Sequence, residues 1–136
     1  MKVKELNNIT STLNVLYVED DITLREQNSE FFQQLFQTIM IATDGEEAWK
    51  LYQKNNFDIV ITDINIPKIN GFSLIRLMQK QNEEQKFLIT TVYKKEELQD
   101  QLKELDLKYF LTKPISTKEL LNMIENIIQE IAVTSS

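Results

Sequence analysis

Short apolar segments alternate along this chain with longer segments in which apolar residues recur at helical spacing. The short segments are rich in β-branched and aliphatic residues, which is typical of buried strands; they cover residues 13–18, 39–42, 57–62, 87–91 and 107–112. The segments that follow repeat apolar residues every three or four positions, which predicts amphipathic helices. We expect these helices to begin near Thr23, Asp44, Gly71, Lys94 and Ser116.

Two of the expected helices carry a capping signal. Asp44 is followed three residues later by Glu47, and Ser116 is followed three residues later by Glu119. Such a pair satisfies backbone N–H groups that the first helical turn leaves without partners. Both pairs therefore mark helix starts.

The alternation of strands and helices, with connections long enough to cross over, predicts an α/β fold. Its centre is one five-stranded parallel sheet with helices on both faces. In such sheets, ligands bind beyond the carboxyl ends of the strands. Four of these ends carry reactive or charged residues: residues 19–21 (Glu-Asp-Asp), Asp63, residues 90–91 (Thr-Thr) and Lys113. We expect them to meet at one edge of the sheet.

The length of 136 residues fits one domain, and 42% hydrophobic with 26% charged residues is normal for a globular chain. We assign residues 1–12 to an N-terminal leader, 13–131 to the domain, and 132–136 to a polar tail or truncated linker. The leader lacks a signal-peptide pattern, and no apolar run is long enough to span a membrane. We therefore expect a cytoplasmic protein that does not bind a membrane.

Composition also removes whole classes of chemistry. The chain has no Cys and no His, which excludes thiol nucleophiles, disulfides, zinc clusters and imidazole bases. Its 21 acidic and 15 basic residues give a net charge of −6, so we expect no direct binding to nucleic acid. Oxygen and amine chemistry remains.

The acidic strand ends indicate a divalent cation. Glu19, Asp20 and Asp63 would bring like charges together, and such a cluster requires a cation or a shared proton. With oxygen ligands alone, the expected cation is Mg²⁺. The hydroxyl of Thr90 and the ammonium of Lys113 would add donors to phosphate oxygens. This set suits phosphoryl transfer to a carboxylate.

Each of these residues alone has an ordinary structural explanation, as a cap, a strand residue or an exposed charge. Their coincidence at successive strand ends favours a site. The chain has only two Gly and two Pro, and Pro67, Gly71 and Pro114 all fall beside these ends. This placement indicates shaped loops around the site.

The same strand ends carry a family resemblance. The motifs are LYVEDD (residues 16–21), DINIPKING (63–71), the strand ending in Thr90, and LTKP (111–114). Through them the chain resembles, over residues 13–131, the receiver domain of bacterial two-component response regulators. The resemblance implies a flavodoxin-like fold with the strand order 2-1-3-4-5.

Carried over residue by residue, the resemblance implies that Asp63 accepts a phosphoryl group from a sensor histidine kinase or a phosphotransfer protein. Asp20 would bind Mg²⁺ directly, Glu19 mainly through water, and Asn65 through its backbone carbonyl. Lys113 would pair with the phosphoryl oxygens. The domain would thus act only on its own aspartate and would not be an enzyme with a separate substrate.

Further positions match the switch of the family or depart from it. Thr90 resembles the hydroxyl that moves toward the phosphoryl group, and Phe110 resembles the switch aromatic, which is Tyr in many relatives. Ordinary core packing is the alternative explanation for Phe110. Thr91 is larger than the residue usual in relatives, which would narrow access to Asp63. Pro114 permits the cis peptide bond that relatives commonly have here.

The output face in this family corresponds to residues 94–130. Leu98, Leu102, Tyr109 and Met123 are candidates for contact with a downstream protein or an attached output domain. A leucine stripe is more often core, and Asp21 is better explained as a helix cap than as a metal ligand.

Three alternative functions can be weighed against the receiver function. A phosphorylation-independent pseudo-receiver would serve only as a docking module, although every residue needed for phosphorylation is present. A Mg²⁺-dependent phosphohydrolase of the haloacid dehalogenase type needs a second Asp two residues after the nucleophile, where this chain has Asn65. A flavin carrier needs a phosphate-binding loop after the first strand, where residues 19–21 would repel phosphate.

Overall fold

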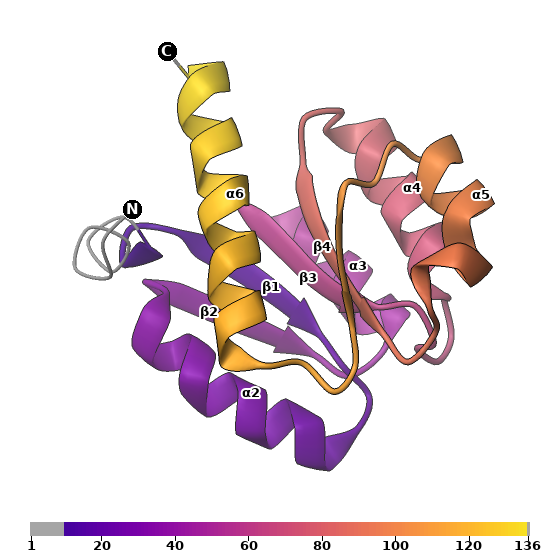
Figure 1. Cartoon of the computed structure of the whole chain (residues 1–136), viewed down its shortest axis with the longest axis horizontal. Coiled ribbons are helices and arrows are strands. Elements are labelled where there is room, and N and C mark those ends of the chain that lie inside the picture. Colours follow the sequence, from indigo (N-terminus) through magenta and orange to yellow (C-terminus); the bar gives the residue numbers. More distant parts are fainter. Residues whose placement is uncertain (1–9, 136) are drawn as a thin grey trace.

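One parallel sheet forms the centre of the computed structural model, which describes residues 10–135 (Figure 1). Its strands are β1 (Asn14–Val18), β2 (Thr38–Ala42), β3 (Ile59–Asp63), β4 (Lys86–Thr91) and β5 (Tyr109–Thr112). They lie in the order β2-β1-β3-β4-β5, and every neighbouring pair is parallel. The expected α/β class and strand order are confirmed.

Helices cover both faces of the sheet (Figure 1). They are α2 (Ile22–Leu35), α3 (Gly45–Lys54), α4 (Gly71–Gln81), the 3₁₀ turn η1 (Lys95–Leu98) that leads into α5 (Gln99–Glu104), and α6 (Thr117–Ser135). Because side chains alternate along each strand, the sheet supports two apolar layers. One layer packs against α2 and α6, and the other packs against α3, α4 and α5.

Side-chain caps fix four helix starts, and at α4 the cap is Asn70, whose side chain accepts from the N–H of Ser73 at 3.0 Å. Asp44 accepts a hydrogen bond from the backbone N–H of Glu47 at 2.8 Å, and Ser116 accepts one from Glu119 at 3.1 Å. Both capping predictions are confirmed. Asp21 caps α2 by accepting from the N–H of Leu24, as expected.

The prediction that a helix begins near Lys94 is wrong. Residues 95–98 form a 3₁₀ turn, and α5 begins only at Gln99. Leu98 and Leu102 are buried in the layer beneath α5, so the core explanation of the leucine stripe is confirmed, and these two leucines are wrong as candidates for contact at the output face. No side chain caps either segment, so the sequence carries no local signal for where α5 begins.

The two ends of the chain bear on the predicted N-terminal leader and the predicted polar tail. Residues 1–9 of the leader lie outside the described residues, and residues 11–12 form a turn before β1. Helix α6 runs to Ser135 and so takes in most of the segment assigned to a tail. Among residues 10–135, no helix is both long and apolar enough to cross a membrane.

Candidate functional site

The carboxyl ends of β1, β3 and β5 bring an ammonium group between two carboxylates. The Nζ of Lys113 lies 2.6 Å from an oxygen of Glu19 and 2.9 Å from Oδ2 of Asp63. Glu19 is 1% exposed and Asp63 8%. The backbone N–H of Lys113 is held by the carbonyl of Thr91 at 2.7 Å. Residues from four strand ends therefore meet at one edge of the sheet.

Asp20 completes an acidic cluster at this edge. Carboxylate oxygens of Glu19, Asp20 and Asp63 all lie within 4.8 Å of one another. Two of the three side chains are buried and Asp20 is exposed, so the cluster opens to solvent on one side. Oxygen ligands at this spacing fit a hard divalent cation that retains part of its water shell.

Burial and charge act on the ionisation of this cluster in opposite directions. Burial raises the pKa of Glu19 above its ordinary value, although hydrogen bonding from Lys113 offsets part of the effect. Burial alone would lower the pKa of Lys113, but hydrogen bonds to Glu19 and Asp63 outweigh it and leave that pKa raised. The ammonium is therefore kept charged by the carboxylates that it separates.

Backbone amides after β3 hold the other oxygen of Asp63. Its Oδ1 accepts from the N–H of Ile64 at 2.6 Å and from the N–H of Asn65 at 3.3 Å. The carboxylate is thus fixed on one oxygen by the loop and on the other by Lys113. Asn65 itself is exposed beside it.

Both glycines of the chain sit where the loop after β3 packs closely. A Cβ on Gly71 would lie 2.6 Å from the carbonyl oxygen of Asp63, and a Cβ on Gly45 would lie 2.2 Å from that of Ile69. The N–H of Gly45 also donates to the carbonyl of Pro67 at 3.0 Å. The absence of a side chain at these two positions lets α3 and α4 clamp the loop that carries the acidic site.

Thr90 and Thr91 face opposite sides of the sheet. Thr90 pairs with Asp63 in the register of β3 and β4, is 3% exposed, and its Oγ1 has no hydrogen-bond partner among the described residues. Thr91 is fully buried, and its Oγ1 accepts from the N–H of Tyr93 at 3.3 Å. The peptide bond between Lys113 and Pro114 is cis.

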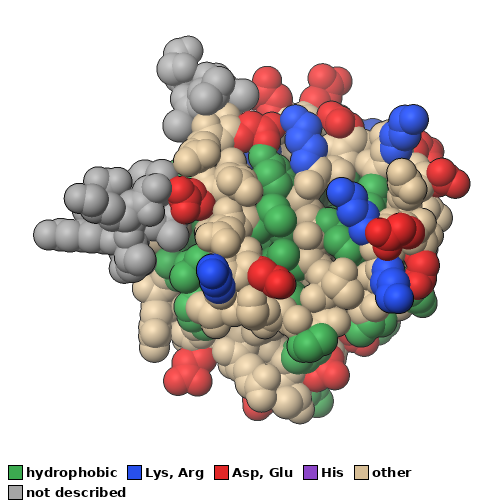
Figure 2. Space-filling view, viewed as in Figure 1, with side chains coloured by type: hydrophobic (Ala, Val, Ile, Leu, Met, Phe, Trp, Pro, Cys, Tyr) green, Lys and Arg blue, Asp and Glu red, His purple; other side chains and the backbone are tan. Residues whose placement is uncertain are grey.

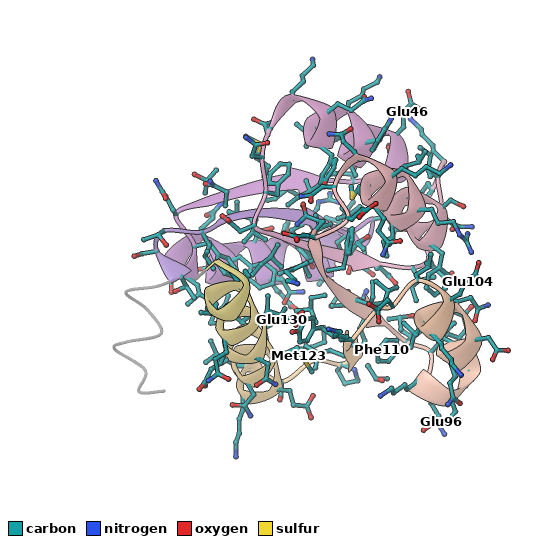
Figure 3. The ribbon with its side chains drawn as sticks, turned by 90° about the horizontal axis from the view of Figure 1, so that it is seen from above. Glu46, Glu96, Glu104, Phe110, Met123 and Glu130 are labelled. Carbon is teal, nitrogen blue, oxygen red and sulfur yellow. The ribbon has the colours of Figure 1, made fainter. Side chains whose placement is uncertain are left out.

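The edge strand β5 is flanked by α6 and α5 (Figure 1). Phe110 is half-buried against the layer under α5, whereas Met123 packs against the layer under α6 (Figure 3). The hydroxyl of Tyr109 donates to Glu130, which also accepts from Lys86 at 3.0 Å. Figure 2 shows a strip of hydrophobic side chains beside α6, on the side toward β5.

Two contributors to the site escaped the sequence reasoning. Nη1 of Arg25 donates to the backbone carbonyls of Glu19 at 3.1 Å and Asp20 at 3.2 Å, so α2 braces the acidic loop. The other contributor is Gly45, which begins α3 and contacts the loop that follows β3. The scarcity of glycine could have drawn attention to Gly45, but the contact of Arg25 has no signal in the pattern of residues.

Known proteins with similar sequences align with most of this chain. A "Probable transcriptional regulator ycf29" of Pyropia yezoensis is 32% identical over 116 residues, which cover 84% of this chain and 52% of that protein. "Regulatory protein VanRB" of Enterococcus faecalis is 28% identical and is covered over 53% of its length. The chain spans about half the length of these curated relatives.

Solved structures give the same relationship. The chemotaxis protein CheY4 of Vibrio cholerae superposes with a TM-score of 0.79 at 28% identity, covering 85% of this chain and 98% of that one. The CheX-CheY-BeF3-Mg+2 complex of Borrelia burgdorferi gives 0.81 at 27% identity, covering 94% and 98%. A family model described as "Response regulator receiver domain" matches residues 15–125. This chain therefore belongs to the receiver domains of two-component response regulators.

Proposed function

We propose that this receiver domain accepts a phosphoryl group on Asp63 and that Mg²⁺ and Lys113 assist the transfer. The observation that carries the proposal is the ammonium of Lys113, 2.6 Å from Glu19 and 2.9 Å from Asp63 within the acidic cluster. Apart from Lys113, no basic side chain of the described residues forms a salt bridge with this cluster.

The reaction follows from the groups present. A carboxylate oxygen of Asp63 would form a bond to phosphorus, while the bond from phosphorus to the imidazole nitrogen of the donor histidine breaks with its electron pair. Mg²⁺ in the cluster would neutralise charge on the phosphoryl oxygens and would also assist the later attack of water. Lys113 would turn from carboxylate to phosphoryl oxygen. The phosphoaspartate would therefore form and decay on the same site.

The proposed ligands for Mg²⁺ are Asp20 directly, Glu19 mainly through water, Asp63, and the backbone carbonyl of Asn65. Asp20 is the exposed member of the cluster and Glu19 the buried one that also contacts Lys113. This difference supports a direct role for Asp20 and an indirect role for Glu19.

We assign the change of state to Thr90 and Phe110. The hydroxyl of Thr90 has no hydrogen-bond partner within residues 10–135 and could bond a phosphoryl oxygen on the neighbouring Asp63. Phe110 is half-buried against the layer under α5, and the proposed change of state would alter its burial. A phosphoryl group controls a partner only to the extent that the partner prefers one of the two states.

The proposed phosphoryl donor is a sensor histidine kinase or a phosphotransfer protein, and the proposed readout lies in residues 94–130. That readout would contact a downstream protein or an output domain attached to the receiver. The cytoplasmic location and the division into leader, domain and tail remain predictions.

Intact mass spectrometry tests the proposal directly. Incubation with acetyl phosphate and MgCl₂ should add one phosphoryl group to the wild-type chain, and the adduct should decay with time. Asp63→Asn should abolish it, whereas Asp106→Asn, the same change at an exposed aspartate, should leave it intact. Chelation of Mg²⁺ by EDTA should prevent it.

If the wild-type protein forms no adduct, Thr91 could be blocking the access of acetyl phosphate to Asp63, and this explanation must then be tested. The variant Thr91→Ala widens that position. Phosphorylation of this variant would support narrow access, and failure of both proteins would refute the proposed function and favour the docking module.

A further inference from the structure

A cavity of about 150 Å³ is lined by residues of α2, of the start of α6 and of the sheet between them. Figure 1 shows where these two helices lie. Its inner wall includes Tyr17, Ile61 and Thr90 from the sheet, all of them buried. At its mouth are Gln27 and Ser116, which are exposed. The cavity is therefore a pocket that opens between two helices, and it is distinct from the acidic cluster.

The polar groups at the base of this pocket do not all have hydrogen-bond partners among the described residues. Thr90 is 3% exposed, and its Oγ1 has no partner among the described residues. The hydroxyl oxygen of Tyr17 accepts from the side-chain amide of Asn28 at 2.9 Å. Burial raises the pKa of Tyr17 far above its ordinary value, so this phenol keeps its proton and remains a donor. A buried polar group without a partner calls for a water molecule or a ligand.

The walls define the chemistry of that ligand. Phe31 and Phe32 line one side, with ring centroids 5.9 Å apart, and Leu120 lines the other. None of the described residues that line the pocket has a charged side chain. A cavity of about this volume holds a benzene-sized ring. An uncharged ring with one hydroxyl or amide group would fill the apolar part and reach the unpaired oxygen.

We propose that this pocket binds a small, uncharged, single-ring ligand whose polar group bonds the hydroxyl of Thr90. Occupancy would hold that hydroxyl away from Asp63. Because binding free energies are reciprocal, a ligand that engages Thr90 would oppose phosphorylation, and phosphorylation would weaken the ligand. This second effect rests on the proposed function, whereas the binding itself does not.

Phenol and toluene are suitable probes, because they differ by a hydroxyl in place of a methyl group. In two-dimensional ¹H–¹⁵N spectra of the full chain, phenol should cause saturable shifts at Thr90, Ser116 and Leu120 at about millimolar concentration. Phenol should bind about fivefold more tightly than toluene, which is the size of effect that one hydrogen bond supplies. Absence of saturable shifts at these residues would overturn the proposal.

Variants of Thr90 show whether its hydroxyl is the anchor. Thr90→Val keeps the shape and should remove the preference for phenol over toluene, whereas Thr90→Ser should keep it. Thr62→Val is the control, because Thr62 is also buried but lies on β3 and faces the side of the sheet away from the pocket, where its Oγ1 donates to the carbonyl of Asp63 at 2.8 Å. It should leave both affinities unchanged. A preference for phenol that survives Thr90→Val would refute the assigned contact.

The intact-mass assay separates this proposal from the proposed function. Phenol should lower the yield of the phosphoryl adduct on the wild-type chain. Saturable phenol binding, with no adduct on either the wild-type chain or Thr91→Ala, would refute the function and leave the pocket standing. An adduct without saturable phenol binding would refute the pocket alone, and phenol binding that leaves the adduct yield unchanged would refute the coupling.

Discussion

Removal of the ammonium between Glu19 and Asp63 tests the electrostatics of the site apart from any reaction. The variant Lys113→Met keeps most of the side-chain volume and deletes the charge that lies 2.6 Å and 2.9 Å from the two carboxylates. Two buried carboxylates then face each other with their nearest counter-charge gone. We expect the folded state to lose stability in metal-free buffer at pH 8.

The magnitude follows from the burial of the three groups. Glu19 is 1% exposed, and the side chains of Asp63 and Lys113 are 12% and 10% exposed. Breaking a buried ion pair by removing one partner costs about 3–5 kcal/mol. We take about 3 kcal/mol, because the open side of the cluster admits water. For a domain of this size, that loss corresponds to a decrease in Tm of about 10 °C.

The pH dependence of the loss identifies its cause. Burial already raises the pKa of Glu19, and loss of the ammonium raises it further. A carboxyl group whose pKa is raised in the folded state stabilises the fold while it is protonated, and this contribution is lost as the pH rises through that pKa. The deficit of Lys113→Met should therefore be largest at pH 8 and smaller at pH 5.

Urea unfolding measures the deficit, with the single Trp49 as the fluorescent probe. The double variant Glu19→Gln/Lys113→Met removes one of the facing charges and should recover part of the loss at pH 8. Lys80→Met changes an exposed lysine and should stay within about 0.5 kcal/mol of the wild type. Equal stability of Lys113→Met and the wild type at pH 8 would refute the reasoning.

Three further predictions concern the surroundings of the site. Gly45→Ala should lower stability by about 2 kcal/mol in urea unfolding, because its Cβ would lie 2.2 Å from a carbonyl oxygen; an unchanged midpoint would contradict the clamp. The pKa of Glu130 is lowered, chiefly by its hydrogen bond from Lys86, so its contribution of about 1 kcal/mol is present near pH 7 and is lost as the pH falls through that lowered pKa. Glu130→Gln should match the wild type in acid and be less stable at neutral pH, and equal curves at both would rule this out. Asp20→Asn should reduce the rise in Tm that MgCl₂ causes while leaving metal-free stability nearly unchanged; an undiminished rise would place the cation elsewhere.

The arrangement of the strand ends was accessible from the sequence because it depends on local signals. Each strand is a short apolar run that stops at a polar residue, and parallel strands align their carboxyl ends. Asp63 and Thr90 are neighbours for this reason, as their pairing in the register of β3 and β4 shows. The order of the strands came from the family resemblance, because no local signal fixes which strand lies beside which.

The start of α5 could not be predicted from local sequence signals. Leu98, Leu102 and Leu105 have helical spacing, and all three are buried, yet the first belongs to a 3₁₀ turn. No side-chain cap marks the start of either segment. The three leucines pack in a core cluster with residues far away in the sequence, and such contacts leave no local signal for the boundary. The brace from Arg25 and the pocket at Thr90 depend on tertiary contacts in the same way.

If Asp63 is phosphorylated as proposed, the position of Lys113 would couple that modification to the binding of Mg²⁺. A phosphoryl group on Asp63 would attract the ammonium that now lies 2.6 Å from Glu19. Glu19 is 1% exposed and would be left with Asp20 as its acidic neighbour, an arrangement that requires a second positive charge. We therefore expect the phosphorylated domain to bind Mg²⁺ more tightly than the unmodified one. Equal affinities, measured by calorimetry on the domain and on its beryllofluoride adduct, would show that Lys113 does not move.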